Sequence, residues 1–439
     1  MSSIQEWSDI KLKYIAEINP SKSEISIIDD TKVTFLPMEN ILSPGNVDLS
    51  LKKSLEDVYS GYTYFKENDL IVAKVTPCFE NGNIAIMQGL SNGIGFGTTE
   101  LHVIRVNEGE YNKKFFYYAL QADDFKKEAI SNMYGVGGLK RIPPEFVCNY
   151  KFKVPSIQVQ NKVVEFLDHK TENIQCLIGE KEKLITLLEE KRQSMITEAV
   201  TKGLNPNVNV KISGVEWIGE IPEHWNLIKF KRVIDFLTDF EANGSFSDVK
   251  SNVRLDSDEA YAWYVRATDL ENKRYGLIEG NRNCDQLTYK FLYKTKLYGG
   301  ELLVAKRGEI GKTYLMPNHN GKATLAPNLY LIRTNKKCIP EYAYYWFQSD
   351  FGKGELVLSN KSTTIGALYK DDIKECMFMM MPLKEQKEIV EFLDGKNKEF
   401  QALLSDIELQ IQRLKEYRQS LIYEAVTGKI DVRDCEVEA

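Results

Sequence analysis

The sequence predicts an α+β fold in which two similar mixed α/β domains are separated by two long helices, and the helices pair as an antiparallel coiled coil. Three observations predict it: a helical segment occurs twice, its apolar side chains recur about every 3.5 residues, and the flanking segments share an order of strands. We expect the halves to be related by an approximate two-fold axis. The expected parts are a first domain, a helix, a second domain, a helix and an acidic tail, at 1–154, 155–203, 204–381 (with a linker at 204–225), 382–428 and 429–439.

The repeated segment is the clearest feature of the chain. Val164–Asp168 reads Val-Glu-Phe-Leu-Asp and returns unchanged as Val390–Asp394, an offset of 226 residues. At the same offset the run Arg192–Thr201 returns as Arg418–Thr427, and roughly half of the paired positions between these ends are identical. Neither copy contains proline after its opening proline, and residues that favour helices dominate. Each copy therefore predicts one long helix.

Apolar or long side chains recur in each helix near the seven-residue period of a coiled-coil seam. A seam on one helix needs a partner, and the other copy is the obvious one. Gly203 and Gly428 follow the two helices, as glycine commonly does at helix ends. The expected seam residues are Leu167, Ile174, Lys181, Leu188 and Met195 with Leu177 and Leu184 between them, and Leu393, Phe400, Ile407, Leu414 and Leu421 with Leu403 between.

The first domain has the alternating short strands and loops of a mixed α/β fold. Leu70–Lys74 is a β-branched run typical of a strand, followed by the loop Val75–Asn83. We expect Gly93–Gly97 to be a flexible connection and Lys113–Met133 to be helical. Tyr134–Arg141 is a glycine-rich basic loop.

The second domain repeats the framework of the first more closely than its loops. Glu301–Lys306 matches Asp69–Lys74, and Asn328–Arg333 matches Glu100–Arg105. The two domains therefore share a predicted fold and differ in what their loops contact.

Composition limits the classes of protein to which the chain can belong. The net charge of −6 does not suggest a nucleic-acid binder, but the acidity lies mainly in 382–439, whereas 204–381 is slightly basic. The sequence contains no run of eighteen apolar residues, so no membrane span is expected. The seven cysteines are scattered without a Cys-x-x-Cys pair and are expected to be reduced, buried thiols of a cytoplasmic protein. The four histidines are isolated from one another and do not suggest a zinc site.

The sequence has no convincing catalytic motif. Gly308–Thr313 resembles the end of a phosphate-binding loop, but Lys306 stands where that motif needs glycine, so we expect a tight β-hairpin there. Gly93–Gly97 has the wrong spacing for a dinucleotide fingerprint. Neither a methyltransferase motif nor a nuclease pairing of carboxylate and lysine stands out. We therefore expect no catalytic residues and no metal ligands in this chain.

Polar and basic loops at the strand ends of both domains are candidates for DNA contact, because Arg, Lys, Asn and Thr pair with base edges and phosphates. Ordinary solvated loops are the alternative. The candidate DNA-binding residues are Lys74, Thr76, Asn81, Asn83, Lys140 and Arg141 in the first domain and Lys306, Arg307, Lys312, Lys361, Ser362, Thr363 and Thr364 in the second, with Arg266, Arg274 and Arg282 as weaker candidates.

Several of these features together resemble the specificity subunits of type I restriction-modification systems. The resemblance rests on the two helical copies, on the linker Ser213–Trp225 and on the loop Lys74–Gly82, and it covers nearly the whole chain. It implies two target-recognition domains, each reading one half of a split double-stranded DNA site.

The resemblance also implies partners. Two methyltransferase subunits would dock on the helices and carry S-adenosylmethionine, and restriction subunits would use ATP and Mg²⁺ for translocation and cleavage, so that this chain needs no cofactor of its own. The alternative is a non-catalytic scaffold whose two similar domains bind proteins instead of DNA.

Overall fold

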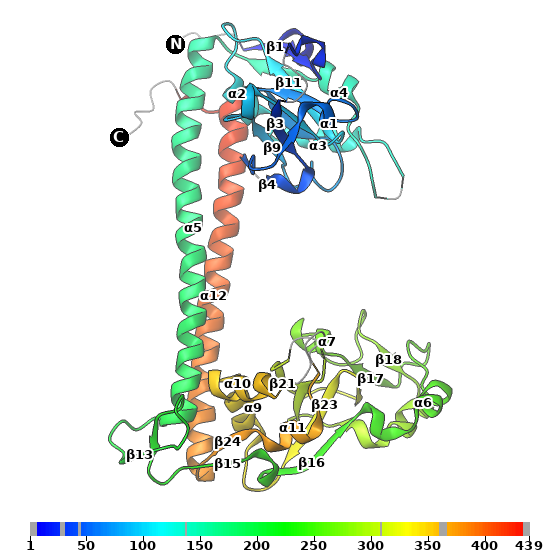
Figure 1. The fold of residues 1–439 in the computed structure, drawn as a ribbon, viewed down its shortest axis with the longest axis vertical. Coiled ribbons are helices and arrows are strands. Elements are labelled where there is room, and N and C mark those ends of the chain that lie inside the picture. The colour runs from blue at the N-terminus through cyan, green and yellow to red at the C-terminus, as the bar shows by residue number, and fades with distance from the viewer. Residues whose placement is uncertain are drawn as a thin grey trace. The chain divides into compact units, whose positions relative to one another are not determined.

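Two long helices, α5 (Ile157–Lys202) and α12 (Leu383–Val426), organise the structure (Figure 1). The structure is a computed structural model, and it describes residues 7–26, 31–42, 45–136, 138–307, 310–359 and 367–432. The chain divides into two units. Unit 1 comprises Met1–Glu182 and Glu408–Ala439, and unit 2 comprises Lys183–Ile407. Each unit therefore contains one domain, one half of α5 and one half of α12.

The described residues of unit 1 form two four-stranded sheets and two short two-stranded ladders. The strand orders are β2-β11-β8-β9, β6-β3-β10-β7, β1-β12 and β4-β5. The strands are β1 (Ser8–Lys11), β2 (Ala16–Ile18), β3 (Lys32–Leu36), β4 (Ile41–Leu42), β5 (Asn46–Val47), β6 (Lys52–Ser54), β7 (Thr63–Lys66), β8 (Leu70–Ala73), β9 (Ile84–Ile86), β10 (Ile94–Gly97), β11 (Leu101–Val106) and β12 (Lys151–Val154).

Unit 2 repeats the two four-stranded sheets and the ladder β1-β12. Its sheets have the orders β16-β23-β20-β21 and β18-β17-β22-β19, and its corresponding ladder is β15-β24. The ladder β13-β14 precedes the second domain and does not correspond to β4-β5. The strands are β13 (Val210–Ile212), β14 (Glu220–Pro222), β15 (Asn226–Lys229), β16 (Ile234–Asp239), β17 (Ala262–Val265), β18 (Asn283–Cys284), β19 (Lys296–Leu297), β20 (Leu302–Ala305), β21 (Thr313–Leu315), β22 (Lys322–Leu325), β23 (Leu329–Thr334) and β24 (Met377–Met380).

The correspondence extends to strand direction. In both units the second sheet contains a parallel pair, β3 with β10 and β17 with β22, and its other pairings are antiparallel. The first sheet is antiparallel in both units. The prediction of two similar mixed α/β domains is confirmed.

Several of the shorter helices also correspond, because two consecutive helices follow β11 in unit 1 and β23 in unit 2, and one more precedes the closing strand of each. Unit 1 has α1 (Leu55–Tyr59), α2 (Lys113–Ala119), α3 (Asp123–Ser131) and α4 (Pro144–Asn149). Unit 2 has α6 (Phe246–Asn252), α7 (Ala267–Glu271), α8 (Gln286–Phe291), α9 (Pro340–Gln348), α10 (Asp350–Leu358) and α11 (Lys370–Glu375).

One local prediction was wrong. Gly93–Gly97, expected to be a flexible connection, contains the inner strand β10, where a Cβ on Gly95 would lie 2.3 Å from the Phe65 ring. Glycine is present there because the aromatic ring occupies the space of a side chain. The prediction that Lys113–Met133 is helical is confirmed by α2 and α3, which are separated by a break at Leu120–Ala122.

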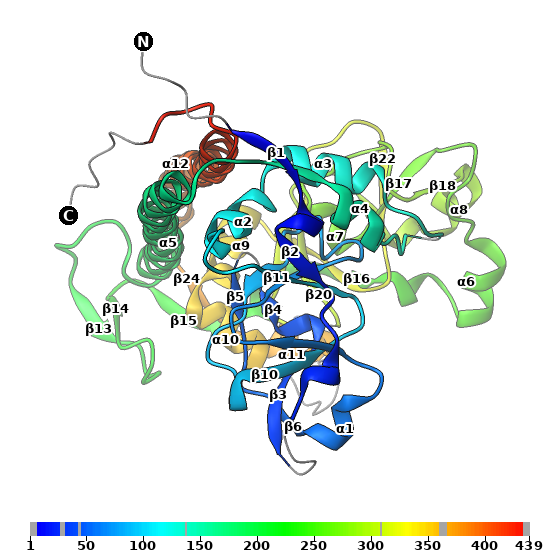
Figure 2. The ribbon, with the colours of Figure 1, turned by 90° about the horizontal axis from the view of Figure 1, so that it is seen from above.

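The long helices pair antiparallel within each unit, as predicted. In unit 1, Lys181 donates from Nζ to Gln410 Oε1 at 2.7 Å, and Arg418 donates to Gln175 Oε1 at 3.0 Å. The numbering rises on α5 as it falls on α12. In unit 2, the end of α5 and the beginning of α12 contribute to one buried cluster. Figure 2 shows the two helices side by side from the end.

The seam differs in part from the expected one. The heptad positions Leu167, Ile174, Leu393, Phe400, Ile407 and Leu421 are buried, but Leu177, Leu184 and Leu403 are 45%, 44% and 50% exposed. Ile178 and Ile411 are buried instead. Ile178 and Ile411 lie four residues after Ile174 and Ile407. The face of each helix that meets its partner therefore combines positions i and i+4, and not positions i and i+3.

Identical polar residues in the two helical copies attach each helix to a domain. Gln160, buried near the start of α5, accepts from the Asn112 amide at 2.8 Å and donates to the Pro155 carbonyl at 2.9 Å. Its counterpart Gln386 accepts from the Ile339 amide at 2.9 Å and donates to the Met381 carbonyl at 2.9 Å. The buried amide satisfies backbone groups that would otherwise lack partners, which explains its occurrence in both copies.

The helix ends are attached in the same way. Gln193 donates to the Gln348 carbonyl at 2.7 Å, and Gln419 donates to the corresponding Gln121 carbonyl. Each domain is therefore bound by the beginning of one long helix and the end of the other.

A glycine follows each long helix and contacts a domain tryptophan. Gly203 and Gly428 have φ of +79° and +71°. A Cβ would lie 3.1 Å from the Trp225 ring at Gly203 and 2.7 Å from the Trp7 ring at Gly428. Glycine is required both by the left-handed conformation and by the close ring.

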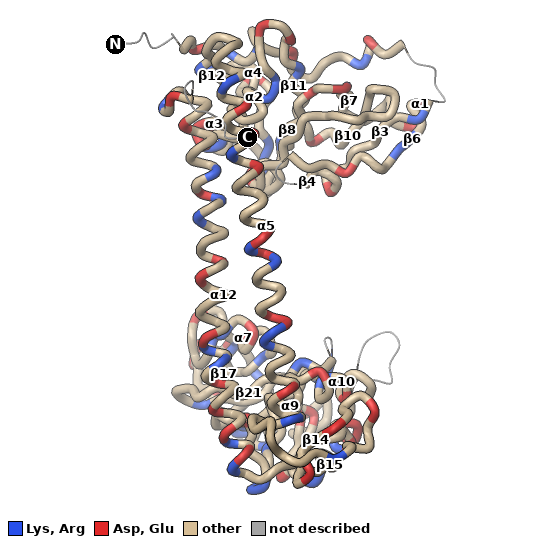
Figure 3. The backbone as a smooth tube through the Cα atoms, turned by 90° about the vertical axis from the view of Figure 1, so that its left-hand side faces the viewer, with Lys and Arg blue, Asp and Glu red and all other residues tan. Residues whose placement is uncertain are grey.

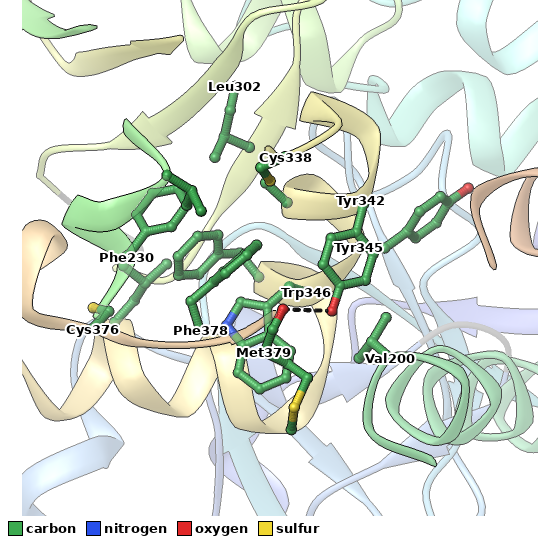
Figure 4. Packing of buried hydrophobic residues seen from close by; sticks show 14 of the residues in the cluster. Val200, Phe230, Leu302, Cys338, Tyr342, Tyr345, Trp346, Cys376, Phe378 and Met379 are labelled. Carbon is green, nitrogen blue, oxygen red and sulfur yellow. Dashed lines mark hydrogen bonds between the residues drawn. The ribbon is translucent and has the colours of Figure 1, made fainter. Parts of the chain in front are cut away.

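The largest core of unit 2 joins the helices to the domain. Val200 of α5 belongs to the same buried cluster as Phe230, Trp346 and Phe378, and Tyr342 donates its hydroxyl to the Met379 carbonyl at 2.9 Å (Figure 4). Burial holds the pKa of Tyr342 well above its usual value. This core fixes the second domain on the end of α5.

The expectations about cysteines and membrane spans can be compared with the described residues. The six described cysteines are unpaired, and Cys284, Cys338 and Cys376 are buried as expected, whereas Cys176 is exposed on α5. Cys435 lies outside the described residues. In the described part of the chain, no helix is both long enough and apolar enough to cross a membrane.

Candidate nucleic-acid interface

The two domains hold their candidate loops on the same backbone frame. In unit 1, the Lys74 amide donates to the Glu100 carbonyl at 2.9 Å, and the Ile142 amide donates to the Lys74 carbonyl at 2.9 Å. In unit 2, the Lys306 amide donates to the Asn328 carbonyl at 2.8 Å, and the Leu368 amide donates to the Lys306 carbonyl at 3.1 Å. The lysine after the central strand thus ties the loop that it begins to a second loop in both domains.

Thr76 joins the two loops of unit 1. Its hydroxyl donates to the Gly138 carbonyl at 2.6 Å and accepts from the Lys140 amide at 3.0 Å, and its own amide donates to the Lys140 carbonyl at 3.0 Å. The Val75–Asn83 loop and the glycine-rich loop therefore form one surface. Thr76 is a connecting residue in this arrangement, and Lys140 is exposed beside it.

Arg141 is paired with a carboxylate of its own domain. Its guanidinium donates to both oxygens of Glu100 at 2.9 and 2.8 Å, and hydrogen bonding from Arg141 lowers the pKa of Glu100. The half-buried pair faces solvent. A guanidinium held in this way keeps a fixed direction but has fewer free donors for a ligand.

The two asparagines of the first loop differ in environment. Asn83 is half-buried and donates from its side chain to the Ile41 carbonyl at 3.0 Å, so it supports the loop from inside. Asn81 is exposed, and its amide donates to the Pro77 carbonyl at 3.0 Å.

A buried histidine on β11 holds the backbone at the end of the glycine-rich loop. His102 Nε2 lies 2.9 Å from the Ile142 carbonyl. Because a carbonyl can only accept, Nε2 carries the proton. Burial, supported by the positive charge of Lys74, lowers the pKa of His102 to about 4, so the imidazole is neutral at physiological pH.

Unit 2 uses a tyrosine for the same purpose. The Tyr330 hydroxyl donates to the Leu368 carbonyl at 2.9 Å, and Tyr330 occupies the position of His102 in the matched run. The two side chains lie on the equivalent strands β11 and β23, and each contacts the carbonyl at the equivalent position of its own domain.

Lys306 is buried, and its ammonium is paired with acids of its own domain. Its Nζ lies 2.8 Å from both Asp239 Oδ2 and Glu241 Oε1. Its relative exposure is 8%. The prediction that Lys306 contacts DNA is not tested by these contacts, but they favour a structural role.

The remaining candidates of unit 2 lie on and near the predicted hairpin. β20 and β21 form that hairpin, and the Ala305 amide donates to the Lys312 carbonyl at 2.9 Å. Arg307 is exposed and forms an isolated bridge with Ala367. Lys312 Nζ lies 2.9 Å from Glu271 Oε1. Lys361, Ser362, Thr363 and Thr364 lie outside the described residues.

The weaker arginine candidates are also engaged within unit 2. Arg266 donates to Asp269 at 2.6 Å, and Arg282 lies 3.5 Å from Asp256. Arg274 lies beside Gly280.

Sequence reasoning missed His102, Tyr330 and Asp239. The first two could have been found, because the matched runs at Glu100 and Asn328 align them as polar residues on a buried strand. Asp239 has no counterpart in those runs, so the sequence offered no signal for it. In the described residues no group of three or more His, Cys, Asp or Glu side chains could hold a metal ion.

Charge is not concentrated on the long helices. Figure 3 shows Lys and Arg interspersed with Asp and Glu along both of them. A single-sign surface that would bind DNA on its own is therefore not present on the helices.

Comparison with known proteins places these features in a family. A family model described as the type I restriction modification DNA specificity domain matches residues 4–186 and 226–413. The specificity subunits of the type I restriction enzymes EcoAI and EcoEI of Escherichia coli are 34% identical over 224 residues and 38% identical over 161 residues. These matches cover 51% and 36% of this chain but 36% and 26% of the relatives' own lengths.

Two solved structures share the fold across nearly the whole chain. One comes from work on complex assembly and conformational transition of the type I R-M system, with a TM-score of 0.72 and 17% identity, covering 97% of this chain and 98% of that one. The HsdS subunit from Thermoanaerobacter tengcongensis has a TM-score of 0.51 and 17% identity, covering 97% of each chain. The two matched copies of the domain, with the shared fold around them, show that the chain belongs to the family of type I restriction modification DNA specificity domains.

Proposed function

We propose that this chain is the sequence-specific DNA-binding subunit of a type I restriction-modification complex, and that each domain reads one half of a bipartite double-stranded DNA site. The observation that carries the proposal is the shared loop frame at Lys74 and Lys306. One framework presents two different loop surfaces, as two independent readers of different half-sites require.

The loop chemistry agrees with this role. Lys140 and Arg307 are exposed at the two loop surfaces, and exposed basic side chains beside turns contact phosphates and base edges. Lys361–Thr364 remain predicted contacts, because they lie in the segment that leads to Leu368 of the frame. The scaffold alternative, with protein-binding domains, is disfavoured by the family's description as a DNA specificity domain.

We propose that the long helices bind two methyltransferase subunits. Leu177, Leu409 and Tyr417 are exposed on the helices of unit 1, and Leu184, Leu187 and Leu403 on those of unit 2. Exposed apolar side chains on paired helices mark surfaces that a protein partner covers. In this proposal the partners bring S-adenosylmethionine and methylate adenine, while restriction subunits bring ATP and Mg²⁺. The chain itself is non-catalytic and acts in the cytoplasm.

The direct experiment is to map methylated bases in cells that carry the methyltransferase subunit with or without this chain. We expect methylation at one split sequence when both are present and none at that sequence when this chain is absent. Methylation that does not depend on the chain would contradict the proposal.

A further inference from the structure

Asp239, at the end of β16, connects two segments of unit 2 through a buried carboxylate. Its Oδ2 lies 2.8 Å from Lys306 Nζ, and its Oδ1 lies 2.6 Å from Lys370 Nζ. Lys306 directly follows β20, whereas Lys370 begins α11, shortly after the Ala367 bridge. One residue thus holds both sides of the loop surface that carries Arg307.

The Lys306 ammonium is held too closely to serve as a free phosphate ligand. The Lys306 ammonium also contacts Glu241 at 2.8 Å and lies 5.5 Å from the centroid of the Tyr330 ring. Asp239 is 3% exposed, so both of its oxygens are shielded from water. A buried charge keeps its partners in place because leaving one of them unpaired is costly.

The charges of this cluster match its geometry. Although burial opposes ionisation, hydrogen bonds from Lys306 and Lys370 lower the pKa of Asp239. Burial likewise opposes the charge of Lys306, but hydrogen bonds to Asp239 and Glu241 raise its pKa. The buried pair of Asp239 and Lys306 is therefore ionised at neutral pH.

The first domain secures the same frame without such a cluster. Lys74 is half-buried, and among the described residues no carboxylate lies within ion-pair distance of it. Its loops are joined by the Thr76 hydroxyl, by His102 and by the partly exposed ion pair of Arg141 with Glu100 instead. Among the described residues, a buried ionic cluster at this loop frame is therefore present only in the second domain.

We propose that Asp239 is a positioning residue that sets the specificity of the second domain, by holding Lys306 and Lys370 so that Arg307 keeps a fixed direction toward the DNA. The proposal rests on the proposed function. It assigns Lys306 to the support of the loop and not to phosphate contact.

The test uses the chain assembled with its methyltransferase subunits and duplexes that carry single base changes in either half-site. Asp239→Asn preserves the shape of the side chain and removes its charge. We expect discrimination against wrong bases to fall at least tenfold in one half-site and to remain unchanged in the other. The matched control is Glu241→Gln, because among the described residues the Glu241 carboxylate pairs only with Lys306. Its side chain is 68% exposed, and we expect less than a threefold change.

Salt dependence separates positioning from direct contact. Lys306→Met keeps the length of the side chain but loses its charge. A phosphate contact would lower the slope of log affinity against log salt by about one. Positioning predicts an unchanged slope with reduced discrimination in the same half-site as Asp239→Asn, so a reduced slope would overturn the proposal.

The outcomes also distinguish this inference from the proposed function. If the wild-type complex recognises no split site, the proposed function fails. If the wild type recognises one and Asp239→Asn discriminates as well as wild type, or loses both half-sites equally, the positioning inference alone fails. Should Asp239→Asn not assemble, Lys370→Met removes one contact from a partly exposed lysine, and the same half-site effect is then required.

Discussion

At the scale of single residues, the structure distinguishes side chains that can meet a ligand from those that hold the loops in place. Sequence reasoning selected basic and polar residues by type, and type alone cannot separate the exposed Arg307 from the buried Lys306 beside it. The separation depends on Asp239, which is far from both in sequence. Identical residues were better guides, since Gln160 and Gln386 occur in both copies and have the same task in both.

His102 gives the first domain a predictable response to pH. The folded domain keeps the imidazole neutral down to about pH 4, whereas the unfolded chain binds a proton below pH 6.5. Because the unfolded state then binds more protons, stability is complete above pH 6.5 and is lost as pH falls toward 4. We expect a loss of about 2 kcal/mol between pH 7 and pH 5 from this group.

Hydrogen exchange of peptides around residues 95–145 at the two pH values measures this loss. His102→Gln is the control, because its amide can donate to the Ile142 carbonyl without binding a proton. The pH dependence should be smaller in this variant by that amount. Equal pH dependence in both proteins would contradict a buried neutral His102.

At the scale of elements, the seven-residue period predicted both long helices. It did not predict all of the buried seam residues, because these depend on the position of the partner helix. A seven-residue period fixes which stripe is apolar, but the side on which the other helix lies selects Ile178 over Leu177. The strand β10 was missed for a similar reason. Its glycines look flexible in isolation and are required by the Phe65 ring, which only the folded sheet brings close.

The glycines of α5 and α12 provide a matched pair of variants in unit 1. Gly428→Ala forces a left-handed conformation on a residue with a Cβ, which costs about 1–2 kcal/mol before contact with Trp7 is counted. Gly179, inside α5, has open space around it, so Gly179→Ala should stabilise by roughly 0.5–1 kcal/mol.

Urea unfolding of the two variants tests this prediction, with the transition of unit 1 followed by exchange of its peptides. Opposite shifts of the midpoint are expected. A neutral Gly428→Ala would mean that the helix end does not need glycine.

At the scale of the whole molecule, duplication made most of the architecture predictable. Matching runs at Asp69 and Glu301 implied two related domains, and the strand orders agree with that. The loops could not be predicted to the same degree, since they are the parts in which the two copies differ. Their residue types suggested an interface, whereas two kinds of support emerged only from the fold. The second domain has a buried ionic cluster at Asp239, and the first has the Thr76 hydroxyl, the His102 imidazole and the partly exposed Arg141–Glu100 pair.

If the helices set the distance between half-sites, lengthening them should change the unread spacer. Inserting one heptad in α5 after Glu182 and one in α12 after Ile407 keeps the seam period and avoids the domain contacts of Gln193 and Gln386. Seven residues add about 10 Å, or about three base pairs of duplex. Three base pairs also turn the DNA by roughly a third of a helical repeat, so duplexes with a full turn of spacer lengths are needed.

Methylation of this spacer series by the assembled complex gives the result. The preferred spacer should lengthen by about three base pairs while both half-sites keep their sequences. An unchanged spacer would mean that the partner subunits, and not the helices, determine the separation.

The most direct test of two independent readers is to replace residues 7–154 by the same domain of a relative with a different target and to map methylated bases in cells. One half of the recognised sequence should change, while the other half and the spacer stay the same. The replacement joins the first domain to α5 at the β12 end, so the second domain and its cluster at Asp239 are untouched. A change in both halves, or in neither, would contradict the account.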